Sequence, residues 1–314
     1  MKIVGTGSAI PELLIKNTEL ERFLDTSDEW IRTRTGIEER RIHSGNLEEL
    51  AAEAARRAIA NAGLAVTDID FLICSTVYNR FMTPGLSCVI QGLIGATCPC
   101  VDINGACAGF VYALEMADAY LTRGHYRKIL IVCAEEPTRM VDWTDRSTCV
   151  LFGDGAAAAV ISGEGETPLF QMHTASNTEV LHAYNPAGNC PYDQSGRTYQ
   201  PVHMNGQEVY KFAVSSATES IRTLCDIAGL SLADIGHFVL HQANLRILEA
   251  VRTRLRQPAE KFPHNLEHYG NTSSASVPLL LDELNRAGIL ARGEKIAMSA
   301  FGAGLTTGAC LLTW

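Results

Sequence analysis

The chain has 314 residues, of which 46% are hydrophobic and 19% are charged. This length suggests about two domains, and the composition predicts a large buried core rather than a disordered chain. The net charge of −9 argues against a general nucleic-acid-binding protein, and no apolar run reaches the roughly 20 residues that cross a bilayer.

The N-terminus reads as a first strand and a turn, without the longer apolar stretch of a signal peptide. The ten cysteines are spread along the chain and form no Cys-x-x-Cys pair. We therefore expect reduced thiols in a cytoplasmic protein, with no membrane segment and no bound metal.

A helix is predicted after Asn46, which is its expected N-cap. Glu49 follows three residues later, which is the spacing of a capping box, and Gly63 ends the helix. The apolar run Phe71–Cys74 then reads as a buried strand.

Residues 101–104 read as a strand, residues 105–109 as a turn of small residues, and residues 110–123 as a helix. Cys107 therefore lies at a strand-to-helix turn, close to a helix N-terminus. The helix dipole and the free N–H groups at such a position favour a thiolate, so we expect a lowered pKa for this thiol. Small neighbours would let a substrate carbonyl approach the sulfur. A buried structural cysteine is the alternative interpretation.

The second half of the chain repeats features of the first. A helix over 207–228 stops at Gly229 and leads to the apolar run Phe238–His241. The pattern Phe-Gly-x-Gly also occurs twice, at 152–155 and at 301–304. We predict two similar α/β halves that meet face to face with a site between them. Chance recurrence in a chain rich in Ala and Gly is the alternative.

His241 follows the second buried strand, at the end where α/β proteins place ligands. Asn271 lies in a loop of small polar residues, 269–276, that opens a further helix. A satisfied core histidine and a turn or N-cap asparagine are the commoner roles of such residues. Spacing alone does not decide the role of either residue.

Two other patterns point to different chemistry. His264-Asn265-Leu266-Glu267-His268 matches the His-x-x-Glu-His motif of inverted zinc peptidases, but barely one helical turn is available to present both imidazoles. The order Cys107, His241, Asn271 also occurs in papain-like proteases, but the residues around the cysteine lack the papain signature.

The chain resembles the β-ketoacyl-acyl-carrier-protein synthase III family, the condensing enzymes that initiate type II fatty-acid synthesis. The resemblance covers essentially the whole chain. Its motifs are Thr26-Ser27-Asp28-Glu29-Trp30-Ile31, Thr33-Arg34-Thr35-Gly36-Ile37, Ala106-Cys107-Ala108-Gly109-Phe110, Phe152-Gly153-Asp154-Gly155-Ala156, His241-Gln242-Ala243-Asn244-Leu245-Arg246 and Gly270-Asn271-Thr272-Ser273. It implies an α/β, thiolase-like, duplicated five-layer α-β-α-β-α fold, which we divide into halves at 1–165 and 166–314.

The resemblance assigns Cys107, His241 and Asn271 as a catalytic triad. The cysteine would attack an acyl-CoA thioester, and the two neutral donors would stabilise the enolate formed when malonyl-acyl carrier protein loses CO₂. The backbone N–H groups of Cys107 and Ala303 would form the oxyanion hole, although glycine is frequent in the family at the Ala303 position.

The same resemblance implies contacts with both substrates. Trp30 and Arg146 would sandwich the adenine of CoA, Arg34 would meet a phosphate, and Asn244 would contact the pantetheine arm. The acyl carrier protein is acidic and calls for a local basic surface. That surface is assigned to basic residues that lie mostly after the histidine, namely Lys211, Arg246, Arg252, Arg254 and Arg256. An ordinary solvated helix face is the alternative interpretation.

In the family, a residue of the partner subunit closes the far end of the acyl pocket. The best register places Thr83 at this gate, with Met82 or Phe81 as the alternatives. We therefore expect a homodimer that uses acyl-CoA and malonyl-acyl carrier protein and needs no cofactor. The rival hypotheses are a related acyltransferase of specialised metabolism, a silent scaffold that binds acyl carrier protein, and a cysteine hydrolase.

Overall fold

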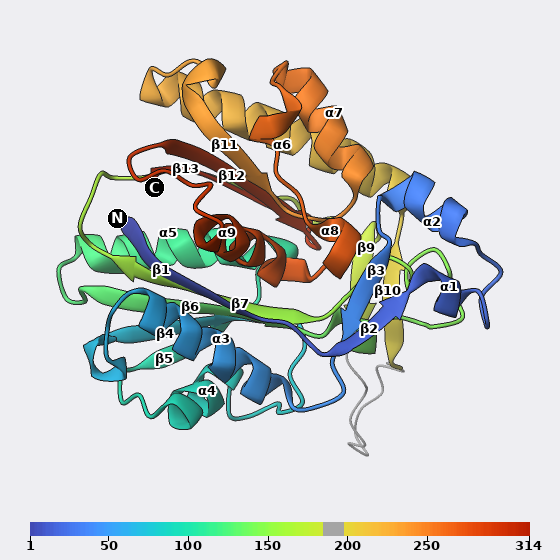
Figure 1. Cartoon of the computed structure of the whole chain (residues 1–314), viewed down its shortest axis with the longest axis horizontal. Helices are drawn as coiled ribbons and strands as arrows, with labels where there is room; N and C mark the ends of the chain where they lie inside the picture. Colours follow the sequence, from blue (N-terminus) through green and yellow to red (C-terminus); the bar gives the residue numbers. More distant parts are fainter. Residues whose placement is uncertain (185–197) are drawn as a thin grey trace.

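The computed structural model describes residues 1–184 and 198–314. Figure 1 shows two β-sheets that alternate with three layers of helices, so the expected five-layer α/β architecture is confirmed. Among the described residues, no helix is long and apolar enough to cross a membrane.

The first sheet has the strand order β1-β7-β6-β4-β5. Strand β4 is parallel to its neighbours β5 and β6, whereas β7 is antiparallel to both β6 and β1. Strands β4 and β7 are buried along their whole length because helices cover both faces of the sheet. The strand bounds are β1 (Lys2–Ala9), β4 (Phe71–Ser75), β5 (Cys100–Ile103), β6 (Lys128–Glu135) and β7 (Gly155–Ser162).

The second sheet has the order β11-β12-β13-β8, with β11 parallel to β12 and the other two pairs antiparallel. This is the pairing pattern of β4-β6-β7-β1 in the first sheet, so the internal repeat of the sequence corresponds to a repeat in the fold. The strand bounds are β8 (Leu169–Thr174), β11 (Ile235–Leu240), β12 (Lys295–Gly302) and β13 (Thr306–Thr313).

Three helical layers enclose the sheets (Figure 1). Helices α3 (Leu47–Asn61) and α4 (Leu86–Ile94) cover the outer face of the first sheet, and α6 (Gly206–Ala228) and α7 (Leu245–Leu255) cover the second. Helices α5 (Gly109–Thr122) and α9 (Ser276–Arg286) lie between the sheets. A side chain at Gly5 or Gly7 of β1 would collide with the backbone of Ala58, so these glycines allow α3 to pack closely.

The remaining elements gather at one end of the layers, on the right of Figure 1. They include two small sheets, each of two antiparallel strands. Their bounds are β2 (Leu13–Lys16), β3 (Glu39–Ile42), β9 (Leu181–Tyr184), β10 (Gln200–Met204), α1 (Asn17–Leu20), α2 (Asp28–Thr35) and α8 (Leu266–Tyr269). Short 3₁₀ turns complete the chain: η1 (Val66–Asp68), η2 (Ala106–Ala108), η3 (Pro137–Arg139), η4 (Leu232–Asp234), η5 (Ala259–Lys261) and η6 (Ser273–Ala275).

The predicted helix ends are mostly correct. Gly229 adopts the left-handed conformation that ends α6, with φ of 67°. Asn46 is the N-cap of α3, but its side chain does not accept a backbone N–H. Its oxygen accepts a bond from Arg80 and its amide donates to the Glu49 carboxylate, so the predicted capping box is wrong.

Candidate active site

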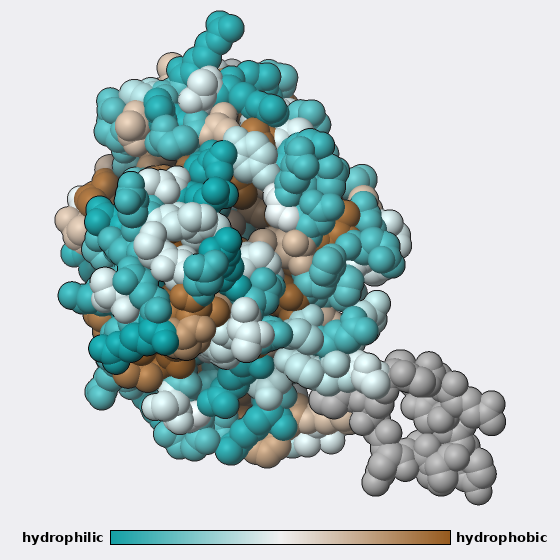
Figure 2. Space-filling view, turned by 90° about the vertical axis from the view of Figure 1, so that its right-hand side faces the viewer, coloured by the Kyte–Doolittle hydropathy of each residue, from teal (hydrophilic) through white to brown (hydrophobic). Residues whose placement is uncertain are grey.

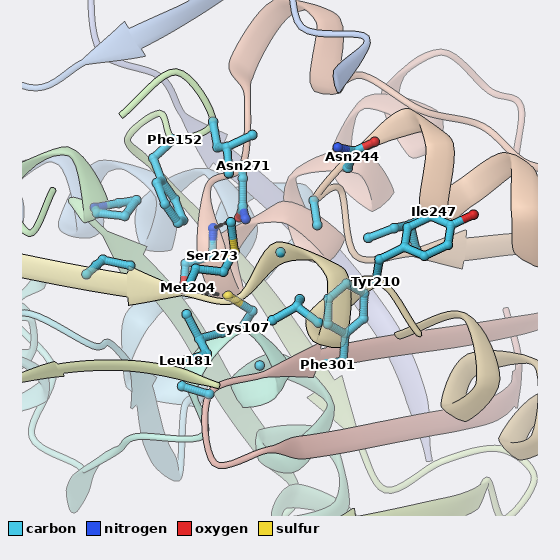
Figure 3. Close-up of a pocket in the computed structure, with 18 of the residues that line it drawn as sticks. Cys107, Phe152, Leu181, Met204, Tyr210, Asn244, Ile247, Asn271, Ser273 and Phe301 are labelled. Atoms are coloured by element: carbon cyan, nitrogen blue, oxygen red, sulfur yellow. Dashed lines mark hydrogen bonds between the residues drawn. The ribbon is translucent and has the colours of Figure 1, made fainter. Parts of the chain in front are cut away.

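A pocket of about 590 Å³ opens at the end of the molecule where β9 and β10 lie. Figure 2 views this end and shows apolar residues in a recess between polar ones. Both halves of the chain line the pocket, and its lining includes Cys107, His241 and Asn271. Figure 3 shows Cys107 and Asn271 close to each other in this pocket. The structure therefore brings the three proposed catalytic residues to one place.

Cys107 lies in η2, between the end of β5 and the start of α5, as the sequence predicted. Ala106 has a φ of 48°, and its N–H donates to Oδ1 of Asn104 at 3.1 Å. A Cβ at Gly302 of β12 would lie 2.7 Å from the Cys107 nitrogen, so only glycine allows the two segments to approach this closely. The second half of the chain thus packs directly against the cysteine turn.

The predicted low pKa of Cys107 is wrong for this structure. Burial raises the pKa of the thiol to about 12, and the nearby Glu135 carboxylate adds to the effect. Apolar surroundings disfavour the charged thiolate more than the turn and its Ser273 contact stabilise it. With this pKa the thiol of Cys107 is protonated at neutral pH, and a role as nucleophile would require a proton acceptor.

His241 follows β11 and is only 1% exposed. Burial lowers the pKa of its imidazole to about 3, so the ring is neutral at physiological pH. Its Nδ1 lies 2.6 Å from Oγ of Ser276, and that same oxygen accepts the N–H of Gln242 at 3.3 Å. The ring edge also contacts Phe301, with centroids 5.2 Å apart.

Asn271 has the turn role that the sequence left open. Its Oδ1 accepts the N–H of Ser273 at 2.8 Å, and its backbone pairs with Phe152. Because the side-chain oxygen is occupied in this way, Nδ2 is the atom of this amide that is available to donate to a ligand. A turn asparagine and a ligand-binding asparagine are therefore compatible roles.

The turns that carry Cys107 and Asn271 have the same backbone path. The N–H of Ser273 donates to Oδ1 of Asn271, just as the N–H of Ala106 donates to Oδ1 of Asn104. Ser273 has a φ of 52° and Ala106 a φ of 48°. The two turns lead into α5 and α9, the paired helices between the sheets. When the two turns are aligned at their asparagines, Ser274 corresponds to Cys107.

The residues assigned to CoA lie around the mouth of the pocket. The guanidinium groups of Arg34 and Arg146 both lie over the ring of Trp30 in α2, at 4.7 Å and 5.1 Å from its centroid. Trp30, Arg34 and Asn244 line the pocket. Asn244 is the N-cap of α7, and its amide donates to the Arg34 carbonyl at 3.2 Å, which ties α7 to α2. Ala303 also lines the pocket, beside Gly302.

The basic residues assigned to the carrier protein differ in their surroundings. Arg246, at the start of α7, lines the pocket, and Arg256 is exposed at the end of this helix. Lys211 forms an ion pair with Glu208 at 2.9 Å, and Arg252 forms one with Glu249 at 2.6 Å; these partners reduce the positive charge that both offer to a docking protein.

Thr83 does not line this chain's own pocket. It is exposed in the segment before α4, beside Met82, whose side chain is 98% exposed. The gate position was assigned through a partner subunit, so it stays a prediction.

The zinc-like motif has a different environment. His264 pairs with Glu267 at 2.9 Å, and His268 lies 3.8 Å from Glu39. Across residues 1–184 and 198–314, no group of three or more His, Cys, Asp or Glu side chains could hold a metal ion. The cysteines in these ranges are all free.

Several residues of the site were not predicted from the sequence. Ser276 holds the histidine, Ser273 contacts the cysteine with an Oγ–Sγ distance of 3.5 Å, and Glu135 is a buried carboxylate behind both serines of η6. The serines lie in the loop of small polar residues, 269–276, that contains Asn271. Glu135 is a charged residue at the end of an apolar strand. This position was the one feature of the sequence that could have indicated its role.

Comparison with known proteins shows which family the chain resembles. The family model for 3-oxoacyl-[acyl-carrier-protein] synthase III matches residues 101–178, and the model for its C-terminal part matches 225–314. The β-ketoacyl-[acyl-carrier-protein] synthase III of Clostridium acetobutylicum is 42% identical, covering 100% of this chain and 98% of the relative.

Solved structures of similar proteins have the same fold. The 3-oxoacyl-[acyl-carrier-protein] synthase III of Aquifex aeolicus is 39% identical, with a TM-score of 0.91 over 100% of this chain and 99% of that one. The synthase III of Thermus thermophilus is 38% identical, with a TM-score of 0.92 and the same coverage of both chains.

Proposed function

The chain belongs to the β-ketoacyl-[acyl-carrier-protein] synthase III family, and we propose that Cys107, His241 and Asn271 carry out the reaction of that family. It is an acyltransferase-type condensing enzyme that initiates fatty-acid synthesis. An acyl-CoA primer and malonyl-acyl carrier protein condense to 3-oxoacyl-acyl carrier protein, CoA and CO₂. The observation that carries the assignment is the meeting of the Cys107 turn with His241 and Asn271 in one pocket.

In the first half-reaction, the sulfur of Cys107 attacks the thioester carbonyl of acyl-CoA. The tetrahedral oxyanion accepts hydrogen bonds from the backbone N–H groups of Cys107 and Ala303. The C–S bond to CoA then breaks, leaving an acyl group on the cysteine.

In the second half-reaction, the malonyl carboxylate leaves as CO₂ and its electron pair forms an enolate on the thioester. Nε2–H of His241 and the amide of Asn271 donate to the enolate oxygen. A neutral imidazole suits this role because it donates a hydrogen bond without protonating the carbanion, and the pKa of about 3 keeps the ring neutral. The carbanion attacks the acyl carbonyl and releases the Cys107 thiolate.

The CoA nucleotide is proposed to bind at Trp30, Arg34, Arg146 and Asn244. The guanidinium groups of Arg34 and Arg146 already lie over the Trp30 ring. In the proposed complex Arg34 binds a phosphate of CoA, and Trp30 and Arg146 stack on the adenine. Arg146 has to move away from the indole to admit a ring between them. Asn244 lies on the path from this mouth towards the cysteine.

The acyl carrier protein is proposed to dock on the surface around Arg246, Arg252, Arg256 and Lys211. We further propose a cytoplasmic homodimer without a cofactor, built from halves at 1–165 and 166–314. Support for the halves comes from the sheets, because the first uses strands up to Ser162 and the second uses strands from Leu169 onward.

The rival functions are less well supported. The curated relatives that match the full chain are β-ketoacyl-[acyl-carrier-protein] synthases III, so a role in specialised metabolism is not favoured. A silent scaffold would not need a nucleophile and two donors in one pocket. A cysteine hydrolase would release free acid, which mass spectrometry of the products detects.

The test is mass spectrometry of the intact protein and of the products. Incubation with acyl-CoA alone should add one acyl mass, which Cys107→Ala removes and Cys88→Ala keeps, because Cys88 is exposed and does not line the pocket. His241→Ala and Asn271→Ala should still accept the acyl group but lose condensation by roughly 10²–10³ each. Labelling that persists in Cys107→Ala, or free acid as the main product, would overturn the proposal.

A further inference from the structure

Glu135 is a fully buried carboxylate at the end of β6, and the reaction described above does not use it. Its Oε1 accepts bonds from both hydroxyls of η6, Ser273 at 3.2 Å and Ser274 at 2.5 Å, and from the Ser274 N–H at 3.3 Å. Its Oε2 accepts the N–H of Val77 at 3.0 Å. Within the described residues, no basic side chain forms an ion pair with it.

Ser273 connects this carboxylate to the nucleophile. Its Oγ lies 3.5 Å from Sγ of Cys107, where the thiol donates, and the hydroxyl proton of Ser273 is donated to Glu135. Figure 3 shows Ser273 beside Cys107 and Asn271. The left-handed φ of 52°, fixed by the Asn271 side chain, places the serine between the two groups.

We propose that Ser273 and Glu135 form a proton relay that accepts the proton of Cys107 when acyl-CoA is attacked and returns it when the product is released. The Cys107 proton moves to Ser273 Oγ while the Ser273 proton moves to Oε1 of Glu135. The sulfur electron pair then forms the bond to the acyl carbon, and CoA leaves as a thiolate that takes a proton from solvent. After condensation, the cysteine leaves as a thiolate and recovers its proton from Glu135 along the same path.

The other groups in the pocket do not fit this task. The neutral imidazole of His241 is a poor base because burial lowers its pKa to about 3. Burial has the opposite effect on the carboxyl group and raises the pKa of Glu135 to about 7, which suits proton exchange at neutral pH. The titratable groups that face Glu135 are the buried thiols of Cys74, Cys107 and Cys133, on β4, η2 and β6.

A purely electrostatic effect of Glu135 predicts the opposite result. A negative carboxylate beside the thiol raises its pKa, so removing that charge would make the thiolate easier to form. The relay instead predicts that removing the carboxylate slows acylation. The two interpretations therefore differ in the sign of the change.

The inference rests on the proposed acylation of Cys107, and the experiment follows that step alone. Rapid-quench acylation by acyl-CoA is measured from pH 5.5 to 9.5 for the wild type and for Glu135→Gln. We expect the wild-type rate to rise with pH and level off above about pH 7, and the variant to lose this inflection and to be at least tenfold slower at pH 7.

A matched pair of serine variants separates the relay from mere support of the carboxylate. Ser273→Ala removes the only hydroxyl in the described residues that hydrogen-bonds both Cys107 and Glu135. Ser274→Ala removes a bond to the same carboxylate oxygen but none to the cysteine. We expect Ser273→Ala to slow acylation like Glu135→Gln, and Ser274→Ala to keep the inflection with a rate within about threefold of wild type.

Three results would overturn the relay: an unchanged inflection in Glu135→Gln, faster acylation of that variant at pH 7, or equal losses in the two serine variants. Circular dichroism and thermal unfolding of each variant identify one that fails to fold. A wild-type protein that takes no acyl group on Cys107 would instead overturn the proposed function itself.

Discussion

The hydroxyl of Ser276 lies 2.6 Å from Nδ1 of His241 and determines which ring nitrogen carries the proton. The serine oxygen already accepts the N–H of Gln242, and in its buried position the hydroxyl proton has Nδ1 as its acceptor. Nδ1 is therefore unprotonated, and the proton of the neutral ring lies on Nε2. The imidazole is thus held as a donor towards the pocket.

Ser276→Ala should slow decarboxylative condensation about tenfold, because a hydrogen bond of roughly 1.5 kcal/mol no longer holds the tautomer. The acylation rate of Cys107 and the KM for malonyl-acyl carrier protein should stay close to wild type. Separate assays of the two half-reactions provide the measurement. Equal losses in both assays would indicate a general distortion of the loop and contradict this role.

The stability of the protein should reflect the burial of His241. In the unfolded chain this histidine binds a proton below about pH 6.5, whereas in the folded protein its pKa is about 3. The unfolded state therefore binds more protons between these values, and stability from this group falls as the pH falls. Between pH 7.5 and 5.0, the wild type should lose about 2 kcal/mol more than His241→Gln does.

Urea unfolding of both proteins at both pH values measures this difference. Glu135 and Asp154 have pKa values raised to about 7 and about 6, so they produce the opposite trend, but they do so in both proteins. The comparison therefore isolates the histidine. Parallel pH dependences in the two proteins would show that the imidazole is protonated while still folded.

Carrier-protein docking should depend more on Arg246 than on Arg252. Arg252 already has a carboxylate partner in Glu249, whereas Arg246 is unpaired in the described structure and lines the pocket mouth. Arg246→Glu should raise the KM for malonyl-acyl carrier protein at least tenfold at low salt, with a smaller effect for Arg252→Glu.

Arg123→Glu is the matched control for this charge reversal. It is exposed at the far end of the 14-residue helix α5, about 20 Å from the cysteine turn. It should leave the KM unchanged, while Arg246→Glu should still permit acylation of Cys107 by acyl-CoA. An equal rise in KM for both variants would point to net charge rather than to a docking surface.

The primer preference tests the predicted gate. A residue as small as threonine at position 83 leaves room for primers longer than acetyl, and each further buried methylene contributes up to about 0.8 kcal/mol. Thr83→Phe should shift the preference towards acetyl-CoA in a competition assay of mixed acyl-CoAs. Because Thr83 lies outside this chain's own pocket, the effect requires a second subunit, and mixed dimers with Cys107→Ala subunits can locate it. An unchanged primer profile would place the gate elsewhere.

The sequence predicted the elements that carry chemistry because their signals are local. The strand, turn and helix around Cys107 follow from small residues between two periodic runs, and Gly229 ends its helix through its own backbone freedom. The thiol pKa was wrong because it depends on burial by segments far away in sequence. The capping box failed for a similar reason, since Arg80 engages the Asn46 oxygen from a distant loop.

The matching turns at Asn104 and Asn271 imply that one ancestral loop was duplicated and that its two copies then acquired different roles. The loop of the first half has Cys107, the proposed nucleophile, three residues after its asparagine, and the loop of the second half has Ser274 there, bound to the buried carboxylate. Asn104 only stabilises its turn, whereas Asn271 stabilises its turn through Oδ1 and is also proposed to donate a hydrogen bond to the substrate through Nδ2. The proposed nucleophile and the proposed hydrogen-bond donor thus lie in equivalent turns of the two halves, and the side chain in either turn can change while the backbone of both turns is kept.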